Sequence, residues 1–285
     1  MTAEITAKVI EHSSYNGQEL ITLEIYSPKF LDAELEKHRM ISSNSSSDRA
    51  MPIAKMMNQE SFIPSDIRLN ERGMQGKTQL DDISKRRFTN SIIKLRKDTC
   101  NMLIGYKHVH KQHLNRYLLP YSMQKKVMTA NKDQWDYFLS LRLHKAADPA
   151  IYELAKCINK AINESKPKEL SLHQWHLPYI SELERKENRI EDLLKSSSAR
   201  CARVSYNNHN GTYPTKEEDF KLFDFLINEE LPHATPTEHQ ALPMKGEGFN
   251  EEGISCLAKD GSYRSGNFHS FVQFRKILED RQWKI

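Results

Sequence analysis

The chain has 285 residues, of which 38% are hydrophobic, enough to bury a large core in a single domain. Its 42 basic and 38 acidic residues leave a net charge of +4, which is too balanced for a nonspecific nucleic-acid binder but suits a site for small anions. The N-terminus has no basic region followed by an apolar run, and no stretch approaches the roughly 20 apolar residues of a membrane span. We therefore expect a cytoplasmic protein without a membrane partner.

The four cysteines lie far apart and form neither a Cys-x-x-Cys pair nor a metal-ligand spacing, so we expect reduced, mostly buried thiols. The sequence also has no Gly-x-Gly-x-x-Gly turn and no phosphate-binding loop of the Gly-x-x-x-x-Gly-Lys-Ser/Thr type. Any bound nucleotide must therefore be held mainly by side chains.

Residues 5–28 predict a β-hairpin that turns at Asn16-Gly17, and the alternation of apolar residues is clear in its second strand, at 20–26. Residues 30–35 have helical spacing. We expect this helix to give way to a loop near Met40.

The stretch 36–50 contains three cations, one histidine, one asparagine and five serines. Serine hydroxyls, amides and arginines at a helix end offer many donors to an anion, and an arginine can bind phosphate through two parallel hydrogen bonds. Phosphate is therefore the ligand that this stretch favours. For an arbitrary serine-rich loop, a solvated polar turn is the more common explanation.

Residues 51–57 can begin a short helix, and 60–77 predict a long connection. From 80 to 114, apolar residues recur among many cations, which predicts one long amphipathic helix or two helices with a break near Gly105. We interpret the cations as a solvated helix face. The histidines at 108–113 have no carboxylate to complete a site, so we expect no metal.

Further along the chain, residues 148–162 predict a helix with one apolar face, and 163–178 predict a polar loop. A charged helix is expected from about 182 to 196. Thr215 and Glu218 form a capping box that starts another helix.

The loop at 36–50 also carries a motif. Its spacing, His-Arg-x-x-Ser-x-Asn-x-x-Ser-x-Arg, resembles the signature Arg-His-Arg-x-x-Ser-x-Asn-x-x-Ser-x-Arg-Tyr of the flavin-dependent thymidylate synthases. The matching residues are His38, Arg39, Ser42, Asn44, Ser47 and Arg49. Lys37 replaces the first arginine and Ala50 replaces the tyrosine. The resemblance is to a divergent member of the kind that large phages carry, which would act in the host cytoplasm.

Two later segments resemble the same family. In Asn115-Arg116-Tyr117-Leu118-Leu119-Pro120, the Arg-x-x-Leu-Pro pattern implies that Arg116 holds the phosphate of the nucleotide. The segment 131–142 resembles the helix Asn-x-x-x-x-x-x-Phe-Leu-x-Leu-Arg, which implies that Asn131 contacts flavin and that Arg142 lies over the pyrimidine ring. Asp133 and Ala146 depart from the family, which often has a flavin-binding arginine and a histidine at these places.

The remaining matches lie in the last third of the chain. Residues 198–206 resemble the small-residue helix, ending in Ala-Arg-Val-Ser/Cys-Tyr, that opens the usual family sequence. His233-Ala234-Thr235-Pro236-Thr237-Glu238-His239 resembles His-x-Ser/Thr-Pro-x-Glu-His, which implies that Thr235 and Glu238 contact flavin and that His233 lies at the substrate entrance. The family places this segment first. The order here is therefore permuted, and we expect a single domain over 1–285 with the family's N-terminal segment relocated to about 198–240.

The resemblance implies an α/β (α+β) fold with a mixed or antiparallel sheet and long helices. It implies reductive methylation of dUMP to dTMP with 5,10-methylenetetrahydrofolate, FAD and NADPH, in a homotetramer. The expected substrate-binding residues are Glu34, Ser47, Arg49, Arg116 and Arg142, of which Ser47 and Arg142 are the catalytic candidates. The expected FAD-binding residues are Lys37, His38, Arg39, Asn131, Thr235 and Glu238.

Two alternatives remain open. Glu34 stands where the family has glutamine, and a carboxylate could accept a hydrogen bond from an amino group. A related enzyme could therefore methylate or hydroxymethylate another deoxypyrimidine monophosphate such as dCMP. A flavin or nucleotide binder without catalysis is the other alternative, and the departures at Lys37, Asp133 and Ala146 favour it.

Overall fold

A five-stranded sheet with the order β3-β4-β2-β1-β5 lies at the centre of the protein. Its strands are β1 (Thr6–Tyr15), β2 (Gln18–Pro28), β3 (Ser42–Ser45), β4 (Met123–Asn131) and β5 (Lys168–Glu169). The computed structural model describes residues 2–49, 51–73, 75–106, 108–204, 211–228, 232–244, 256–257, 263–264 and 266–282. β5 runs parallel to β1, and the other neighbours in this sheet pair antiparallel. The expected α/β fold with a mixed sheet is confirmed.

The hairpin of β1 and β2 turns where the sequence predicts. Asn16 and Gly17 both have positive φ angles, 49° and 74°, which is the backbone that the tightest hairpin turns require. The two strands then pair from Tyr15 opposite Gln18 to Thr6 opposite Tyr26, with one irregularity between Val9 and Glu11.

Two strands of the sheet depart from the sequence predictions. β4 pairs with β2 along its whole length, although no strand was expected there. β3 pairs with β4 inside the stretch that was predicted to be a loop after Met40, so that prediction is wrong for residues 42–45. The polar sequence of β3 has no strand pattern of its own. It becomes a strand because the edge of β4 supplies its hydrogen-bond partners.

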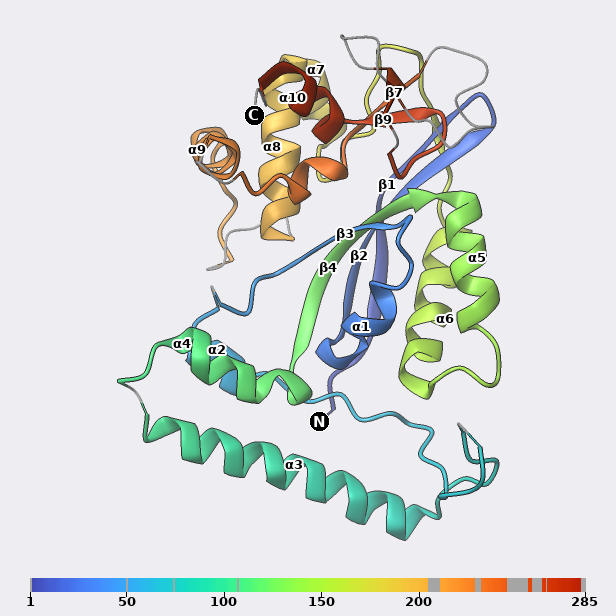
Figure 1. Ribbon diagram of the computed structural model, residues 1–285, viewed down its shortest axis with the longest axis vertical. Helices are drawn as coiled ribbons and strands as arrows, with labels where there is room; N and C mark the ends of the chain where they lie inside the picture. The colour runs from blue at the N-terminus through green and yellow to red at the C-terminus, as the bar shows by residue number, and fades with distance from the viewer. Residues whose placement is uncertain are drawn as a thin grey trace.

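α5 (Lys132–Arg142) and α6 (Pro149–Asn163) cover one face of the sheet (Figure 1). Alternate residues of β2 point into this layer and pack against Trp135 and Phe138 of α5 and Ile151 of α6. Each such large side chain contributes about 1.5–3 kcal/mol when it is fully buried. α6 begins as predicted, because the Asp148 side chain accepts hydrogen bonds from the first free backbone N–H groups of the helix.

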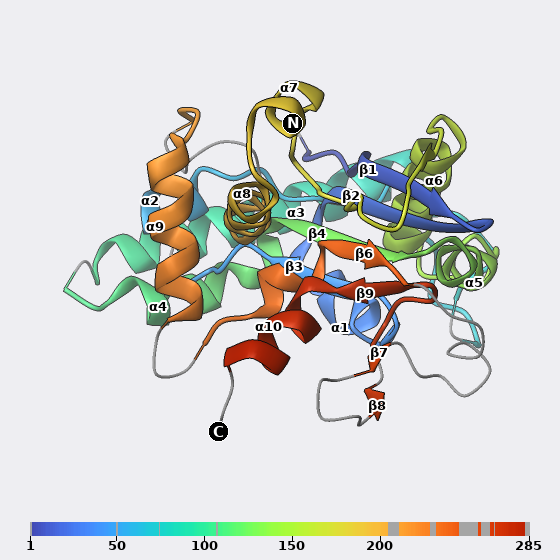
Figure 2. The same ribbon diagram turned by 90° about the horizontal axis from the view of Figure 1, so that it is seen from above.

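The other residues of β2 face the C-terminal part of the chain. Leu20 packs against a cluster that includes Phe268 and Phe271, and Thr22 bonds to His176. The C-terminal elements are α7 (Glu182–Glu187), α8 (Ile190–Arg203), α9 (Lys216–Ile227), η3 (Thr235–Glu238), β6 (Ala241–Pro243), β7 (Cys256–Leu257), β8 (Tyr263–Arg264), β9 (Phe271–Gln273) and α10 (Phe274–Gln282). β6 and β9 pair and lie beside the main sheet when it is seen from above (Figure 2).

The helix predicted at 182–196 is divided at Asn188 into α7 and α8. The capping box of Thr215 and Glu218 is confirmed at the start of α9. Of the cysteines whose side chains the structure describes, only Cys201 is buried, while Cys100 and Cys157 are half-buried. All three are unpaired thiols, so the expectation of mostly buried thiols is wrong for two of them.

A second group of helices lies beside the sheet and consists of η1 (Lys29–Leu31), α1 (Asp32–Leu35), α2 (Ile53–Met57), α3 (Asp82–Ile104), α4 (Lys111–Leu114) and η2 (Asn115–Tyr121). The predicted break near Gly105 is confirmed, since Gly105 ends α3. α3 runs apart from the sheet (Figure 1), and Leu103 is its one buried residue. Its apolar residues are largely exposed, including Ile83 at 72% and Leu95 at 53%.

Among the described helices, none combines the length and the apolar character needed to cross a membrane. Within the same residues, no group of three His, Cys, Asp or Glu side chains is arranged to hold a metal ion.

Candidate functional site

Ser47, Arg49 and Arg116 line one cavity of about 600 Å³. It lies where the chain leaves β3 and meets α4 and η2. Its complete lining is Lys29, Ser45, Ser46, Ser47, Asp48, Arg49, Gln112, Asn115, Arg116 and Leu119. Both arginines are exposed, and neither forms an ion pair with a residue that the structure describes. Their guanidinium groups are therefore available to an anion in the cavity.

Asn115 fixes the loop that carries Ser47 and Arg49. Its buried side chain donates through Nδ2 to the backbone oxygens of Asp48, at 2.7 Å, and Met51, at 2.9 Å. Because Asn115 precedes Arg116 directly, these two bonds set the loop beside that arginine. No motif contained Asn115, and a single asparagine offers no spacing that could have identified it.

Lys29 also lines the cavity and was absent from every motif. Its Nζ lies 2.7 Å from Asp32 Oδ2, 3.2 Å from Asp48 Oδ2 and 2.8 Å from Gln124 Oε1. Burial opposes the charged ammonium group, but the two carboxylates outweigh burial and raise the pKa of Lys29 above its ordinary value. Lys29 is therefore a fixed cation at one side of the cavity.

A second cluster joins Glu34, His38 and Arg142, which the sequence assigned to substrate and flavin. Arg142, at the end of α5, donates from Nε to His38 Nε2 at 3.2 Å and from Nη1 to Glu34 Oε2 at 3.0 Å. An accepting Nε2 requires a neutral imidazole with its proton on Nδ1. Burial and the charge of Arg142 both lower the pKa of His38 below its ordinary value, in agreement with a neutral ring. The ring packs edge-on against Phe138, with centroids 4.8 Å apart.

Lys37 and Arg39 flank His38 and are exposed. Neither has an ion-pair partner within the described part of the chain. Two cationic side chains that lack such partners and lie so close in sequence can both donate hydrogen bonds to a diphosphate.

The C-terminal segment returns to this region. Gln273 Nε2 donates to Ser42 Oγ and to the backbone oxygen of Glu238, both at 2.9 Å, which joins η3 to β3. Asn44 Nδ2 donates to the backbone oxygen of Cys201 at 2.9 Å, which joins β3 to the end of α8. Ser205 and Tyr206 of the expected match lie outside the described residues. The contacts lie within one subunit.

The model of the family described as "Thymidylate synthase complementing protein" matches residues 4–168, more than half of the chain. The chain belongs to this family, the flavin-dependent thymidylate synthases. The match includes the loop at 36–50, Arg116 and Arg142, and it supports a methyltransferase-type enzyme of thymidylate synthesis.

No curated protein is detectably similar in sequence to the chain. Among solved structures, a similar one is a UMP/dUMP methylase, PolB from Streptomyces cacaoi, bound with 5-Br UMP. It shares 15% identity and has a TM-score of 0.49, with 57% of this chain and 90% of that chain covered. The family assignment rests on the sequence match alone.

Two of the residues that the family signature assigns to flavin are engaged within the protein. Asn131 is fully buried, donates to the backbone oxygens of Glu19 and His269, and accepts from the His269 N–H. A flavin would have to displace His269 to reach this amide. The Glu238 carboxylate forms an ion pair with Arg275. Thr235 and His233 are exposed.

A chain of buried polar side chains, which the sequence analysis missed, runs behind η3. Thr129 Oγ1 is hydrogen-bonded to His239 Nδ1 at 2.9 Å and to Thr22 Oγ1 at 2.7 Å, and Thr22 is bonded in turn to His176. Burial lowers the pKa of His239 to about 3, and it also lowers the pKa of His176 well below its ordinary value. Both rings are therefore neutral at pH 7.

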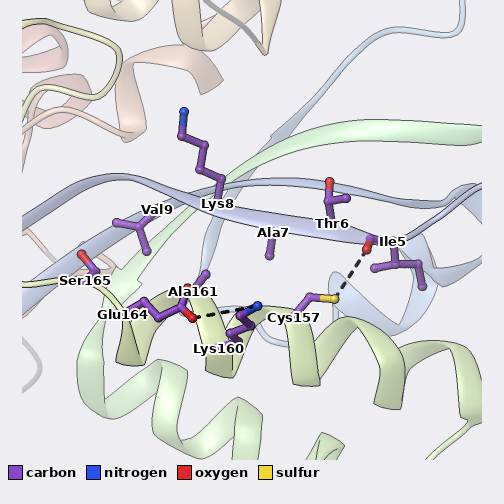
Figure 3. A pocket seen from close by; sticks show the side chains of 10 residues that line it. All are labelled: Ile5, Thr6, Ala7, Lys8, Val9, Cys157, Lys160, Ala161, Glu164 and Ser165. Atoms are coloured by element: carbon purple, nitrogen blue, oxygen red, sulfur yellow. Dashed lines mark hydrogen bonds and ion pairs between the residues drawn. The ribbon is translucent and has the colours of Figure 1, made fainter.

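Another hollow, of about 510 Å³, opens between β1 and α6 and is lined by none of the family's signature residues (Figure 3). Cys157 donates from Sγ to the Ile5 backbone oxygen at 3.5 Å, and Lys160 pairs with Glu164 at 3.9 Å. Burial raises the pKa of Cys157, which keeps it a thiol. The cavity at Ser47 therefore remains the candidate site.

Proposed function

We propose that this chain is a flavin-dependent thymidylate synthase that converts dUMP to dTMP by reductive methylation. The observation that carries the proposal is that Ser47, Arg49 and Arg116, from two separate motifs, line one cavity. Its volume of about 600 Å³ falls within the range of sites that take small ligands.

The phosphate of the nucleotide would bind Arg49 and Arg116. A phosphate dianion calls for fixed cations, and neither arginine is engaged with another described residue. Ser47 would bind the nucleotide through its hydroxyl. Within the described residues, no side chain bonds to Ser47 as a general base would, which supports binding over nucleophilic attack.

The pyrimidine ring would lie beside Arg142. The guanidinium group would stabilise negative charge on the carbonyl side of the ring as C5 becomes nucleophilic. Glu34 and His38 orient this group through the bonds at 3.0 and 3.2 Å. His38 is neutral and accepts a hydrogen bond from Arg142, so it does not neutralise the positive charge of the guanidinium group.

FAD would be held on one side by Lys37 and Arg39, whose exposed cations fit its diphosphate. On the other side it would be held by Thr235 and Glu238 from η3, and the ion pair between Glu238 and Arg275 would have to open. When bound, FAD would supply hydride transfer, with NADPH as the reductant and 5,10-methylenetetrahydrofolate as the carbon donor. His233, which is exposed, would lie at the entrance for these molecules.

The chain would form one domain over 1–285, with the family's N-terminal segment relocated to about 198–240. The bonds from Asn44 to Cys201 and from Gln273 to Ser42 and Glu238 support this proposal. They join the relocated segment to the loop at 36–50 within one subunit.

The enzyme would be a cytoplasmic homotetramer. Assembly with other subunits is supported by α3, which exposes Ile83, Phe88, Leu95 and Met102 over its length and buries one residue. Such an apolar surface is usually covered in a stable protein. Light scattering on a purified sample measures the oligomeric state directly, and a monomer would refute this part of the proposal.

Glu34 favours a second candidate, an enzyme that modifies C5 of dCMP. Its carboxylate lies 3.0 Å from Arg142, the residue proposed to meet the base. A carboxylate cannot donate to a uracil oxygen, but it can accept from the amino group of cytosine.

The test is a turnover assay in which dUMP or dCMP is supplied with FAD, NADPH and methylenetetrahydrofolate. We expect a yellow protein that NADPH bleaches and that releases dTMP. A product from dCMP alone would favour the second candidate. A protein that binds FAD but acts on no deoxypyrimidine monophosphate would be a binder without catalysis. A colourless protein without FAD affinity in calorimetry would refute the assignment of a flavin enzyme.

A further inference from the structure

The Ser47 cavity is lined by three cations and by one carboxylate, Asp48, which would repel a bound anion. Lys29, Arg49 and Arg116 are positive, and Asp48 is negative. These four charges sum to +2, which balances the charge of about −1.5 to −2 that a phosphate monoester carries at pH 7. A carboxylate in a phosphate site is costly unless a cation neutralises it.

Lys29 is the one cation within ion-pair distance of Asp48 among the described residues, at 3.2 Å. An ammonium group has three N–H donors, and Lys29 faces three protein acceptors, on Asp32, Asp48 and Gln124. It therefore has no donor left for a phosphate. Asp32 keeps a second cation, Lys126, at 3.0 Å, so loss of Lys29 would leave Asp48 as the uncompensated carboxylate.

Asp48 is also held through its backbone, because its carbonyl oxygen accepts from Asn115 Nδ2 at 2.7 Å. Ser47 and Arg49 are its immediate neighbours in the chain. Fixing Asp48 at both its side chain and its backbone therefore fixes the residues on either side of it, which line the cavity with Arg116.

We propose that Lys29 is a positioning residue of the phosphate site. It neutralises Asp48 without touching the phosphate itself, and the bond from Asn115 to the Asp48 backbone holds Ser47 and Arg49 in place whether or not the ion pair forms. This inference rests on the proposed function for the identity of the nucleotide. Its charge argument applies to any phosphate that the cavity binds.

The test measures binding of dUMP, deoxyuridine and inorganic phosphate by calorimetry in Lys29→Met, Asp48→Asn and the double variant. We expect Lys29→Met to weaken dUMP binding at least tenfold and to change deoxyuridine binding less than twofold, because deoxyuridine lacks the phosphate. Asp48→Asn should stay within threefold of the wild type. The double variant should return to within threefold, because it has no carboxylate to neutralise.

Lys125→Met is the matched control, since the Lys125 side chain pairs at 3.5 Å with Glu24 and neither residue lines the cavity. The Lys125 backbone oxygen, which accepts from Ser46, is unchanged by the substitution. It should leave dUMP affinity unchanged. Lys29→Arg keeps the charge and should stay within threefold of the wild type. Lys29→Gln, which can still bond to Asp32 and Gln124, takes the place of Lys29→Met if thermal unfolding shows that the latter does not fold.

Three results would overturn the inference: unchanged dUMP affinity in Lys29→Met, no recovery in the double variant, or an equal loss for deoxyuridine. A double variant that stays weak would mean that Lys29 contacts phosphate directly. If the wild type binds inorganic phosphate but no pyrimidine nucleotide, the proposed function fails, and the same variants test Lys29 with inorganic phosphate. If it binds neither, the inference fails too.

Discussion

Asn44 Nδ2 donates a hydrogen bond of 2.9 Å to the backbone oxygen of Cys201, a residue 157 positions further along the chain. Cys201 lies in the last turn of α8, and its oxygen also accepts from the N–H of Val204, the residue that ends the helix, at 3.0 Å. An asparagine of the family signature therefore adds a second hydrogen bond to this carbonyl and joins β3 to the end of α8.

Asn44→Ala should lower the free energy of unfolding by about 0.5–1.5 kcal/mol, because it removes one hydrogen bond, while the Cys201 oxygen keeps its bond from the Val204 N–H. Flavin affinity should fall with it, because the wall formed by η3 packs on the same strand. Urea unfolding and FAD titration measure the two effects. Asn159→Ala, which removes an exposed side-chain bond within α6, is the control and should change neither. Unchanged stability in Asn44→Ala would refute this structural role.

Arg49→Ala and Arg116→Ala should each weaken dUMP binding, because each removes a cation from the cavity. Charge-assisted hydrogen bonds contribute about 1.5–3 kcal/mol, which corresponds to roughly a 10- to 150-fold loss of affinity. Flavin content should stay near that of the wild type, since neither residue is among the expected FAD contacts. If both variants bind dUMP as tightly as the wild type, the proposed phosphate site is wrong.

The sequence predicted those elements whose signals are local. The Asn16-Gly17 turn and the Thr215 capping box are confirmed because each depends on a few adjacent residues. β4 was missed because Lys125 and Lys126 interrupt an apolar strand pattern. Lys126 is only 1% exposed, since Asp32 and Glu36 contact its Nζ at 3.0 and 2.5 Å. That burial depends on α1, which is distant in sequence.

For the candidate site too, the sequence selects the residues that belong to a motif and misses the others. The signature spacing selected Ser47, Arg49 and Arg116, and the fold brings them to one cavity, although their roles remain predictions. Lys29 and Asn115 belong to no motif, so only the folded arrangement reveals them. Asn131 was expected to contact flavin, but the return of residues 267–270 to β4 occupies its amide. A motif cannot indicate such competition from a distant segment.

Glu34→Gln should change the relative turnover of dUMP and dCMP. In the wild type, Glu34 accepts from Arg142 at 3.0 Å and can accept from an amino group on the base. A glutamine can also donate, which favours a uracil oxygen, so the ratio should move toward dUMP. Steady-state assays with both nucleotides measure the ratio. Equal effects on the two would exclude a role for Glu34 in reading the base.

The last prediction concerns acid stability and begins with His239. Burial lowers its folded-state pKa to about 3, whereas an unfolded chain has a pKa near 6.5. The stability that the neutral ring contributes is therefore complete above pH 6.5 and is lost as the pH falls toward 3, because the unfolded state binds the proton first. The loss should reach about 2 kcal/mol by pH 5, at roughly 1.4 kcal/mol per pH unit.

His239→Asn tests this directly, because an asparagine oxygen can replace Nδ1 as the partner of Thr129 without titrating. The variant should be less stable than the wild type at pH 8, where the wild-type ring is neutral and better packed. The difference should shrink as the pH falls, because only the wild type loses the contribution of His239. His176 is common to both proteins and cancels in the comparison. Urea unfolding of both proteins from pH 8 to pH 4.5 measures the difference. A difference independent of pH would mean that His239 titrates alike in the folded and unfolded chains, which its complete burial opposes.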